Sequence, residues 1–331
     1  MHFPALPHRP RKAIAMVAAM LCCALGSGIA VAQSYTSQPI RIIVPYTPGT
    51  GNDILARTVG QRINERWKTP VVVENRPGAS GNIGTAAVAR SAPDGLTLLV
   101  APNNFVINPY VFKDAQYDPF KDFEPVALLG WGRLLLVANP AMRFTNARDL
   151  IEAAKAQPGR ITYASPGSGT PHHVSMELFK VTSGIDMLHV PYKGSSGAVT
   201  DIIAGNVNVM FLPIHVALPY VKEGRLIVLG LGSAKRSPNA PDITTLAEQG
   251  IKGAEVDIWY ALFAPAGTPR EIVRRLHQTV NEILEGPETK GLLAKQGLEV
   301  ETASIEAFKS LMERDSVRWG RVARSAKLTA N

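Results

Sequence analysis

The chain has 331 residues, 46% of them hydrophobic, and a formal net charge of +8. This length allows two domains, and the mixed composition excludes a disordered or fibrous protein. The basic residues form no block with interleaved aromatic side chains, which argues against a nucleic-acid-binding protein.

The N-terminus, residues 1–32, has the pattern of a secretory signal peptide. Arg9, Arg11 and Lys12 precede an apolar run that ends in Ala30-Val31-Ala32. A charged region, a hydrophobic region and an A-x-A site in this order indicate cleavage after Ala32 and export to the periplasm. The alternative is an uncleaved N-terminal membrane anchor.

Both cysteines, Cys22 and Cys23, lie inside this segment. Residues 33–331 therefore hold no cysteine nucleophile, disulfide or thiolate metal ligand. The adjacent His172 and His173 have no metal-ligand spacing, so we expect no metal site. No later stretch has 18 or more uninterrupted apolar residues, so we expect no transmembrane helix in the mature part.

Short β-branched runs and helical periods alternate after Tyr35. Strands are predicted over 40–44, 71–75 and 97–101, with helices between them. Such a β-α-β-α-β series predicts a parallel sheet with right-handed crossovers. Ligands of these sheets lie outside the carboxyl ends of the strands.

Two apolar segments are predicted to cross between domains. The first consists of the runs 126–129 and 134–137, which are broken by Gly130-Trp131-Gly132-Arg133, and the second is the run 257–264. Glycine permits the backbone change that a hinge needs. The first segment is therefore predicted to be a crossing with a hinge at its glycines.

A second series of strands and helices is predicted between the crossings. Its strands cover 161–164, 187–190, 207–212 and 226–231, and its helices include one capped by Asn146 and one capped by Thr170. Helices over 269–284, 288–296 and 305–323 complete the chain.

The predicted fold class is therefore α/β with two lobes. Residues 33–130 and 263–331 form lobe 1, and residues 131–262 form lobe 2. Two lobes joined by crossing segments form a cleft that can close on a ligand.

Three loops rich in glycine, proline and hydroxyl residues each precede a helix. They lie in the stretches 44–53, 163–172 and 190–196. A loop that leads from a strand into a helix aims unpaired backbone N–H groups and the positive end of the helix dipole at one point. That arrangement suits an anion, so the three loops predict a shared site for a small acidic molecule.

Catalytic motifs are weak in this chain. Ser168 and His172 are a candidate Ser–His pair, but the G-x-S-x-G elbow is absent. The sequence has no G-x-x-x-x-G-K-[ST] phosphate loop, and Gly49-Thr50-Gly51 lacks the third glycine of a dinucleotide fingerprint. We therefore expect no cofactor, and an exported hydrolase is kept only as an alternative.

A series of motifs in fixed order resembles the Bug (TctC-type) family, the extracytoplasmic solute receptors of tripartite tricarboxylate transporters. The motifs lie at 39–45, 53–57, 73–78, 81–84, 92–95, 190–194 and 264–269. The resemblance implies a two-lobed periplasmic binding protein (flytrap) fold. It also implies that backbone amides and ordered waters hold a small carboxylate between the lobes, with few charged side chains.

The loops and the resemblance together give the candidate ligand-binding residues. They are Tyr46, Thr47, Gly49, Thr50, Gly51, Asp53, Asn82, Ser165, Gly167, Ser168, Gly169, Thr170, His172, Tyr192, Lys193 and Gly194. In the family, a Gly-Gly pair and a hydroxyl residue usually follow the proline. Here Gly49-Thr50-Gly51 follows Pro48, so we do not copy the ligand from a relative.

Several candidates have an alternative explanation. Asp53 can stabilise the helix dipole from the first turn. The hydroxyls of Ser165, Ser168 and Thr170 can order a loop or cap a helix. Lys193 can be a solvated surface residue, and the two loop tyrosines can be packing residues.

The expected function is that of a non-enzymatic periplasmic receptor. It would capture a small organic carboxylate, which the resemblance narrows to a di- or tricarboxylate, an acidic amino acid or an aromatic acid. The expected partner is the membrane permease of a tripartite tricarboxylate-type transporter. A receptor that feeds a sensor kinase is the remaining alternative.

Overall fold

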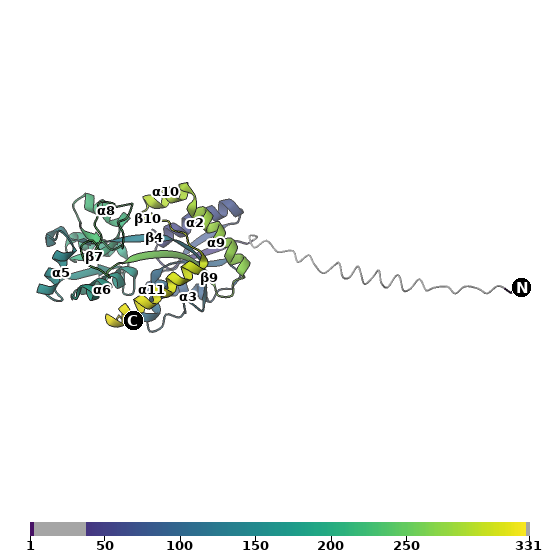
Figure 1. The fold of residues 1–331 in the computed structure, drawn as a ribbon, viewed down its shortest axis with the longest axis horizontal. Helices are drawn as coiled ribbons and strands as arrows, with labels where there is room; N and C mark the ends of the chain where they lie inside the picture. Colours follow the sequence, from purple (N-terminus) through teal and green to yellow (C-terminus); the bar gives the residue numbers. More distant parts are fainter. Residues whose placement is uncertain (3–37, 329–331) are drawn as a thin grey trace. The chain divides into compact units, whose positions relative to one another are not determined.

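The computed structural model describes residues 1–2 and 38–328, and Figure 1 shows the course of the chain. Both cysteines and nearly all of the expected signal peptide lie outside the described residues. None of the helices in the described ranges combines the length and the apolar character needed to cross a membrane.

The first series of strands and helices forms as predicted. Strands β1 (Ile40–Val44), β2 (Val71–Asn75) and β3 (Thr97–Pro102) pair in parallel, with β1 in the middle. Helices α2 (Gly51–Trp67) and α3 (Asn82–Ala89) connect them. The apolar runs predicted these strands because both faces of a parallel strand are covered.

Two long strands run between the two parts of the sheet. Strand β9 (Asp257–Pro265) lies between β3 and β4 (Phe123–Ala138) and is antiparallel to both. Strand β4 pairs with β9 as far as Arg133, and from Leu134 onward it pairs with strands of the second part. These two strands are the crossings that the apolar runs predicted.

Strand β4 continues through Gly130–Arg133 without a break, and a hinge at these glycines stays a prediction. Gly130 has φ +145°, and a Cβ there would lie 2.4 Å from the carbonyl oxygen of Glu299 in strand β10 (Leu298–Glu299). The glycine thus permits the close approach of β10 to β4. The local irregularity is absorbed by register shifts between Pro125 and Gly130.

The second part of the sheet combines parallel and antiparallel strands. Strand β5 pairs in parallel with β6 and β7, while β4 pairs antiparallel with β7 and β8. Its strands are β5 (Thr162–Ser165), β6 (Leu188–Pro191), β7 (Val209–Pro213) and β8 (Ile227–Leu231). Its helices are α5 (Ala147–Ala156), α6 (Pro171–Ser183), α7 (Ser195–Ala204) and α8 (Ile214–Lys222).

The last helices pack back on the long strands. Helix α9 (Arg270–Glu285) contacts α2 and β4, and α10 (Pro287–Lys295) follows it. Helix α11 (Ile305–Ser325), yellow in Figure 1, contacts β4 and also α6 of the second part. The short helices are η1 (Ala79–Gly81), η2 (Asn103–Val106), α4 (Asn108–Val111) and η3 (Pro140–Met142).

Each part of the sheet has its own apolar core. In the first part, the rings of Phe105 and Phe263 stack with centroids 4.3 Å apart, and Phe123 packs edge-on against Phe105. In the second part, Leu135 and Leu212 are among a cluster of buried aliphatic residues between the sheet and helices α7 and α8. Separate cores are the arrangement expected of two lobes joined by crossing strands.

Candidate ligand-binding site

A cavity of about 660 Å³ lies among the loops at the ends of the strands and is lined by residues of both parts. The first part supplies the loop 46–52 together with Pro102, Ile258 and Tyr260. The second part supplies residues from the starts of α6, α7 and α8. This volume is within the usual range for small-molecule sites.

Four helices, α2, α6, α7 and α8, present residues of their first turns to the cavity. Their N-cap residues, Thr50, Thr170, Gly194 and Pro213, form no side-chain cap hydrogen bond. Uncapped first turns hold backbone N–H groups without a partner in their own helix, at the positive end of the dipole. The cavity is therefore an environment that favours a negative charge.

Thr170 is the N-cap residue of α6 as predicted, but its side chain forms no cap hydrogen bond. Its hydroxyl instead donates to the carbonyl oxygen of Gly167 at 2.7 Å, and the bond closes the loop before the helix. Asn146 does cap α5 as predicted, because its side chain accepts hydrogen bonds from the backbone of Arg148 and Asp149.

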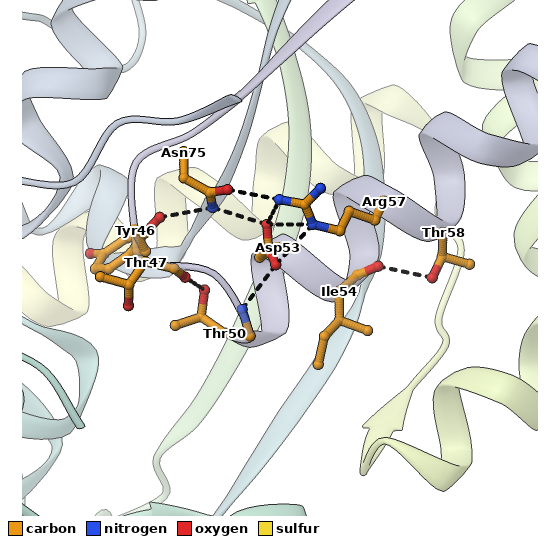
Figure 2. Close-up of polar contacts among 9 residues, drawn as sticks. Tyr46, Thr47, Thr50, Asp53, Ile54, Arg57, Thr58 and Asn75 are labelled. Atoms are coloured by element: carbon orange, nitrogen blue, oxygen red, sulfur yellow. Dashed lines mark hydrogen bonds and ion pairs between the residues drawn. The ribbon is translucent and has the colours of Figure 1, made fainter. Parts of the chain in front are cut away.

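Asp53 organises the first loop, as Figure 2 shows. Its carboxylate accepts hydrogen bonds from the backbone N–H of Gly49 at 2.9 Å, from Arg57 Nε at 3.0 Å and from Asn75 Nδ2 at 2.9 Å. Burial alone would raise the pKa of Asp53, but these hydrogen bonds together lower it below its usual value of 3.8. The carboxylate is thus occupied within the protein, and Asp53 does not line the cavity.

The first turn of α2 lies so close to Tyr260 that only glycine fits at position 51. A Cβ on Gly51 would lie 2.6 Å from the phenolic oxygen of Tyr260, and real Cβ atoms do not come so close to another atom. Tyr260 and Gly51 both line the cavity. The chain thus has glycine where the family usually has a hydroxyl residue, and Tyr260 brings a hydroxyl group beside it.

One carbonyl oxygen in η1 accepts hydrogen bonds from three side chains. The carbonyl oxygen of Ser80 accepts hydrogen bonds from Tyr46 Oη at 2.9 Å, Asn104 Nδ2 at 2.8 Å and Asn108 Nδ2 at 3.0 Å. Ser80 has φ +52°, a strained conformation that persists only where its surroundings hold it. Asn82 supports the same network, since its Oδ1 accepts from Asn108 Nδ2 at 2.6 Å.

The side chain of Ser80 connects the two parts of the protein. Its hydroxyl donates to the carbonyl oxygen of Ser168 at 2.5 Å. Ser80 lies in the expected lobe 1 and Ser168 in the expected lobe 2. The bond therefore joins one loop of each expected lobe, outside the cavity lining.

The loop 165–172 uses several of its own polar groups. The N–H of Gly167 donates to Ser165 Oγ at 3.2 Å, and the N–H of Gly169 donates to His173 Nδ1 at 3.0 Å. Ser165 Oγ also shares a 2.7 Å hydrogen bond with His189 Nε2. The backbone donors of Gly167 and Gly169 thus hold the loop in shape.

Two imidazoles lie beneath this loop. The rings of His173 and His189 stack with centroids 4.0 Å apart, and Tyr163 stacks on His189 at 4.8 Å. Tyr163 donates to Glu177, which also accepts from Lys180. Burial lowers the pKa of His173 to about 4 and that of His189 to about 3, so both rings are neutral at pH 7.

The third loop is tied to the second. The N–H groups of Tyr192 and Gly194 donate to the carbonyl oxygens of Ser165 and Pro166 at 2.9 and 3.1 Å. The Tyr192 hydroxyl donates to Asp201 at 2.5 Å. Tyr192, Lys193 and Gly194 do not line the cavity, whereas Ser195 and Ser196 of the following helix do.

Two lining residues carry buried polar atoms without a partner among the described residues. They are Asn52, through Nδ2, and His172, through both ring nitrogens. Burial lowers the pKa of His172 to about 4. An unsatisfied buried polar atom costs roughly 1–3 kcal/mol, and a ligand oxygen or an ordered water would remove that cost.

The predicted site residues fall into two groups. Those that line the cavity are Tyr46, Thr47, Gly49, Thr50, Gly51, Thr170 and His172. Those outside the lining are Asp53, Asn82, Ser165, Gly167, Ser168, Gly169, Tyr192, Lys193 and Gly194. Direct ligand contact stays a prediction for both groups.

Several lining residues were not among the named candidates, although Asn52, Ser195 and Ser196 lie within the predicted loop stretches. They include Asn52, Ser195, Ser196, His215, Tyr260 and Arg225. The position of Asn52 and Ser195 in the first turns of α2 and α7 was a usable signal, because first-turn groups face an anion bound at a helix start. No local signal marks Tyr260 or Arg225, which the fold alone brings to the cavity.

Comparison with known proteins identifies the family. The family model described as tripartite tricarboxylate transporter family receptor matches residues 55–328. A protein in the tcbD-tcbE intergenic region of Pseudomonas sp. (strain P51) is 33% identical over 90% of this chain and 89% of its own length. Protein BugT of Bordetella pertussis is 33% identical over 88% of this chain and 90% of its own.

Solved structures agree in fold. Rpa4515 of R. palustris, with adipate, is 32% identical with a TM-score of 0.82 and covers 89% of this chain and 99% of its own. MatC from Rhodopseudomonas palustris, with bound malate, is 28% identical with a TM-score of 0.79 and covers 86% and 99%. The fold is thus that of a periplasmic binding protein. The chain belongs to the tripartite tricarboxylate transporter receptor family, so the expected fold and family are confirmed.

Proposed function

We propose that this protein captures a small organic carboxylate in the cavity between its two parts and delivers it to a transporter. The convergence of four uncapped helix starts on one cavity carries the proposal. The part of the chain described here supplies no Asp or Glu to the lining. An anion therefore meets favourable dipoles and no opposing carboxylate.

The available donors are sufficient for useful affinity. Hydrogen bonds to charged groups contribute roughly 1.5–3 kcal/mol each. Four or five of them approach the ~8 kcal/mol of a micromolar complex, less the cost of ordering the partners. First-turn N–H groups, Asn52 Nδ2 and the hydroxyls of Ser195 and Ser196 provide such donors at the cavity.

Relatives support the carboxylate class. Rpa4515 was solved with adipate and MatC with malate, both of which are carboxylates. An acidic amino acid fits this chain less well, because its ammonium group has no carboxylate to pair with in the lining.

The contacts favour a receptor over a hydrolase. His172 shares no hydrogen bond with Ser168, since neither of its ring nitrogens has a partner among the described residues. The Ser–His pair that does form, Ser165 with His189, is closed to substrate because Ser165 is fully buried. We infer that the protein is not an enzyme.

Family membership also supports the partner and the compartment. A receptor of this family delivers its ligand to membrane permease subunits, and we propose the same for this chain. The signal-peptide pattern of residues 1–32 supports export to the periplasm.

A thermal-shift screen of residues 33–331 tests the proposal. The panel contains di- and tricarboxylates, acidic amino acids and aromatic acids, each with its amide as a control. A ligand at 100 times its Kd stabilises the protein by roughly 2.7 kcal/mol, so a binding acid raises Tm while its amide does not. If amides and acids shift Tm equally, or no acid shifts it after denaturation and refolding have removed bound ligand, the carboxylate proposal fails.

A further inference from the structure

The cavity extends well beyond the helix starts. Ser195, Val199 and Ile203 of α7 all line it, and their i, i+4, i+8 spacing places them on one face of the helix. A rise of 1.5 Å per residue puts Ser195 and Ile203 roughly 12 Å apart along the axis. The cavity therefore follows nearly the whole length of α7.

The walls of this extension are apolar. Ile203 of α7 and Val216 of α8, both partly buried, line it together with the buried Val199 of α7. Tyr220, one turn after Val216 on α8, adds an aromatic ring. Backbone donors at the helix starts thus give way to a hydrocarbon surface farther along the same cavity.

Arg225 lies beyond the end of α8 and carries the only charged side chain in the lining contributed by residues 38–328. Its guanidinium lies over the ring of Tyr220, 5.2 Å from the centroid. Its only ion pair with a described residue is to Glu223 at 3.3 Å, and both side chains are half exposed. Exposed pairs of this kind are weak, so Arg225 is able to exchange Glu223 for a ligand anion.

We propose that the ligand is an elongated dicarboxylic acid with an apolar body. This inference rests on the proposed function, since its first carboxylate occupies the helix starts. The body lies along Val199, Ile203 and Val216, and the second carboxylate pairs with Arg225. Three bonds of an extended chain span at most ~3.6 Å, so the seven bonds of an eight-carbon diacid span roughly 8 Å and the three bonds of succinate less than half of that.

Three acids separate the parts of this proposal: suberate (an eight-carbon diacid), octanoate (an eight-carbon monoacid) and succinate (a four-carbon diacid). Kd values come from calorimetry on residues 33–331. Suberate is expected to bind at least tenfold more tightly than succinate, because apolar burial grows with each methylene. It is expected to bind about fivefold more tightly than octanoate, the effect of one partly exposed ion pair.

Two variants with matched controls locate these differences. Arg225→Gln removes the preference for suberate over octanoate and leaves octanoate unchanged. Arg236→Gln, at an exposed arginine paired with Glu248 outside the cavity, is the control.

Val216→Thr keeps the shape of the side chain but adds a hydroxyl group. It weakens suberate and octanoate about threefold to tenfold, comparable to the transfer effect of one polar substitution, and spares succinate. Val181→Thr, at an exposed valine, is its control.

Several results overturn the proposal. If succinate binds as tightly as suberate, the proposed contact with an apolar ligand body is wrong. If the Arg225→Gln variant keeps the preference for suberate over octanoate, the proposed second carboxylate site at Arg225 is wrong. Both leave the carboxylate-receptor function standing. If none of the three acids binds while another acid of the screen does, the elongated diacid is wrong and the receptor function stands. If no acid binds at all, both proposals fail.

Discussion

The carboxylate of Asp53 accepts a hydrogen bond from the backbone N–H of Gly49, four residues earlier, at 2.9 Å. The two residues therefore close the first ligand loop on itself. Asp53 also pairs with Arg57 and Asn75 and is almost fully buried. Asp53 affects the cavity by shaping the loop 46–53. Arg57 compensates its negative charge, so the carboxylate does not oppose an anion in the cavity.

We expect Asp53→Asn to loosen this loop. The variant loses the ion pair with Arg57 and weakens the bond from Gly49, so we expect a loss of about 1–3 kcal/mol in the free energy of unfolding and weaker ligand binding. Urea denaturation and calorimetry measure the two effects. Glu65→Gln, which breaks an exposed pair with Arg62, should change stability by less than about 1 kcal/mol. Equal effects of the two substitutions would contradict the special role of Asp53.

Gly51→Ala should damage the site through Tyr260. The added Cβ would meet the Tyr260 hydroxyl at 2.6 Å, so the ring or the first turn of α2 must move. We expect ligand affinity to fall about tenfold or more, the scale of a ~1.4 kcal/mol loss. Gly291→Ala in α10 has open space around it and should instead stabilise the protein by about 0.5–1 kcal/mol.

A double variant identifies the cause of the Gly51 effect. If the clash is responsible, Tyr260→Leu should make the protein tolerant of Gly51→Ala, so that the two effects are strongly non-additive. Additive losses in affinity would show that glycine is needed at this position for another reason.

Stability should fall as the pH drops below 6.5. Burial lowers the pKa of His173 to about 4 from its usual 6.5. The unfolded chain therefore binds a proton at this residue between pH 6.5 and 4, while the folded chain does not. The free energy of unfolding should fall by roughly 1.4 kcal/mol per pH unit for this residue across that interval.

Urea unfolding at pH 7.5, 6.5, 5.5 and 4.5 measures this dependence. His173→Gln should reduce the slope by roughly 1.4 kcal/mol per pH unit between pH 6.5 and 4, because glutamine does not titrate. Other buried histidines, among them His172 and His189, whose pKa values burial also lowers, keep part of the slope. The neighbouring groups are His189, which stacks on His173, and Tyr163, Glu177 and Lys180 beyond it. An unchanged slope in the variant would assign the pH dependence to other groups.

The bond between Ser80 and Ser168 should favour the closed form. Ser80→Ala removes the hydroxyl donor but keeps the carbonyl oxygen that holds Tyr46, Asn104 and Asn108. One hydrogen bond contributes roughly 0.5–1.5 kcal/mol, so we expect a ligand affinity about twofold to tenfold lower. Small-angle scattering should show a larger radius of gyration without ligand.

A control distinguishes this effect from a general loss of hydrogen bonding. Thr302→Ala removes an exposed hydrogen bond to Glu285 within the expected lobe 1. It should change neither the ligand affinity nor the radius of gyration. A Ser80→Ala protein with the scattering curve of the parent would show that the bond does not stabilise closure.

The local elements of the fold could be read from the sequence. The strand at Ile40–Val44, the helix after it and the Asn146 cap of α5 appear where they were predicted. Such features depend on residues that are neighbours in the chain, through apolar periodicity and side-chain capping. The ordered motifs likewise identified the family, because each is a short run of consecutive residues.

Tertiary structure decided how the site is built. Groups outside the loop 165–172 hold it in shape. Ser80 donates to the carbonyl oxygen of Ser168, and His189 shares a hydrogen bond with Ser165 Oγ. The N–H of Gly169 donates to His173 in the helix that follows. Tyr260 and Arg225 come to the cavity through a crossing strand and a helix end that no short motif marks. The sequence by itself determined that these loops lead into helix starts, whose dipoles favour an anion. Only the tertiary structure decided which candidate residues line the cavity, because residues far apart in the chain meet there.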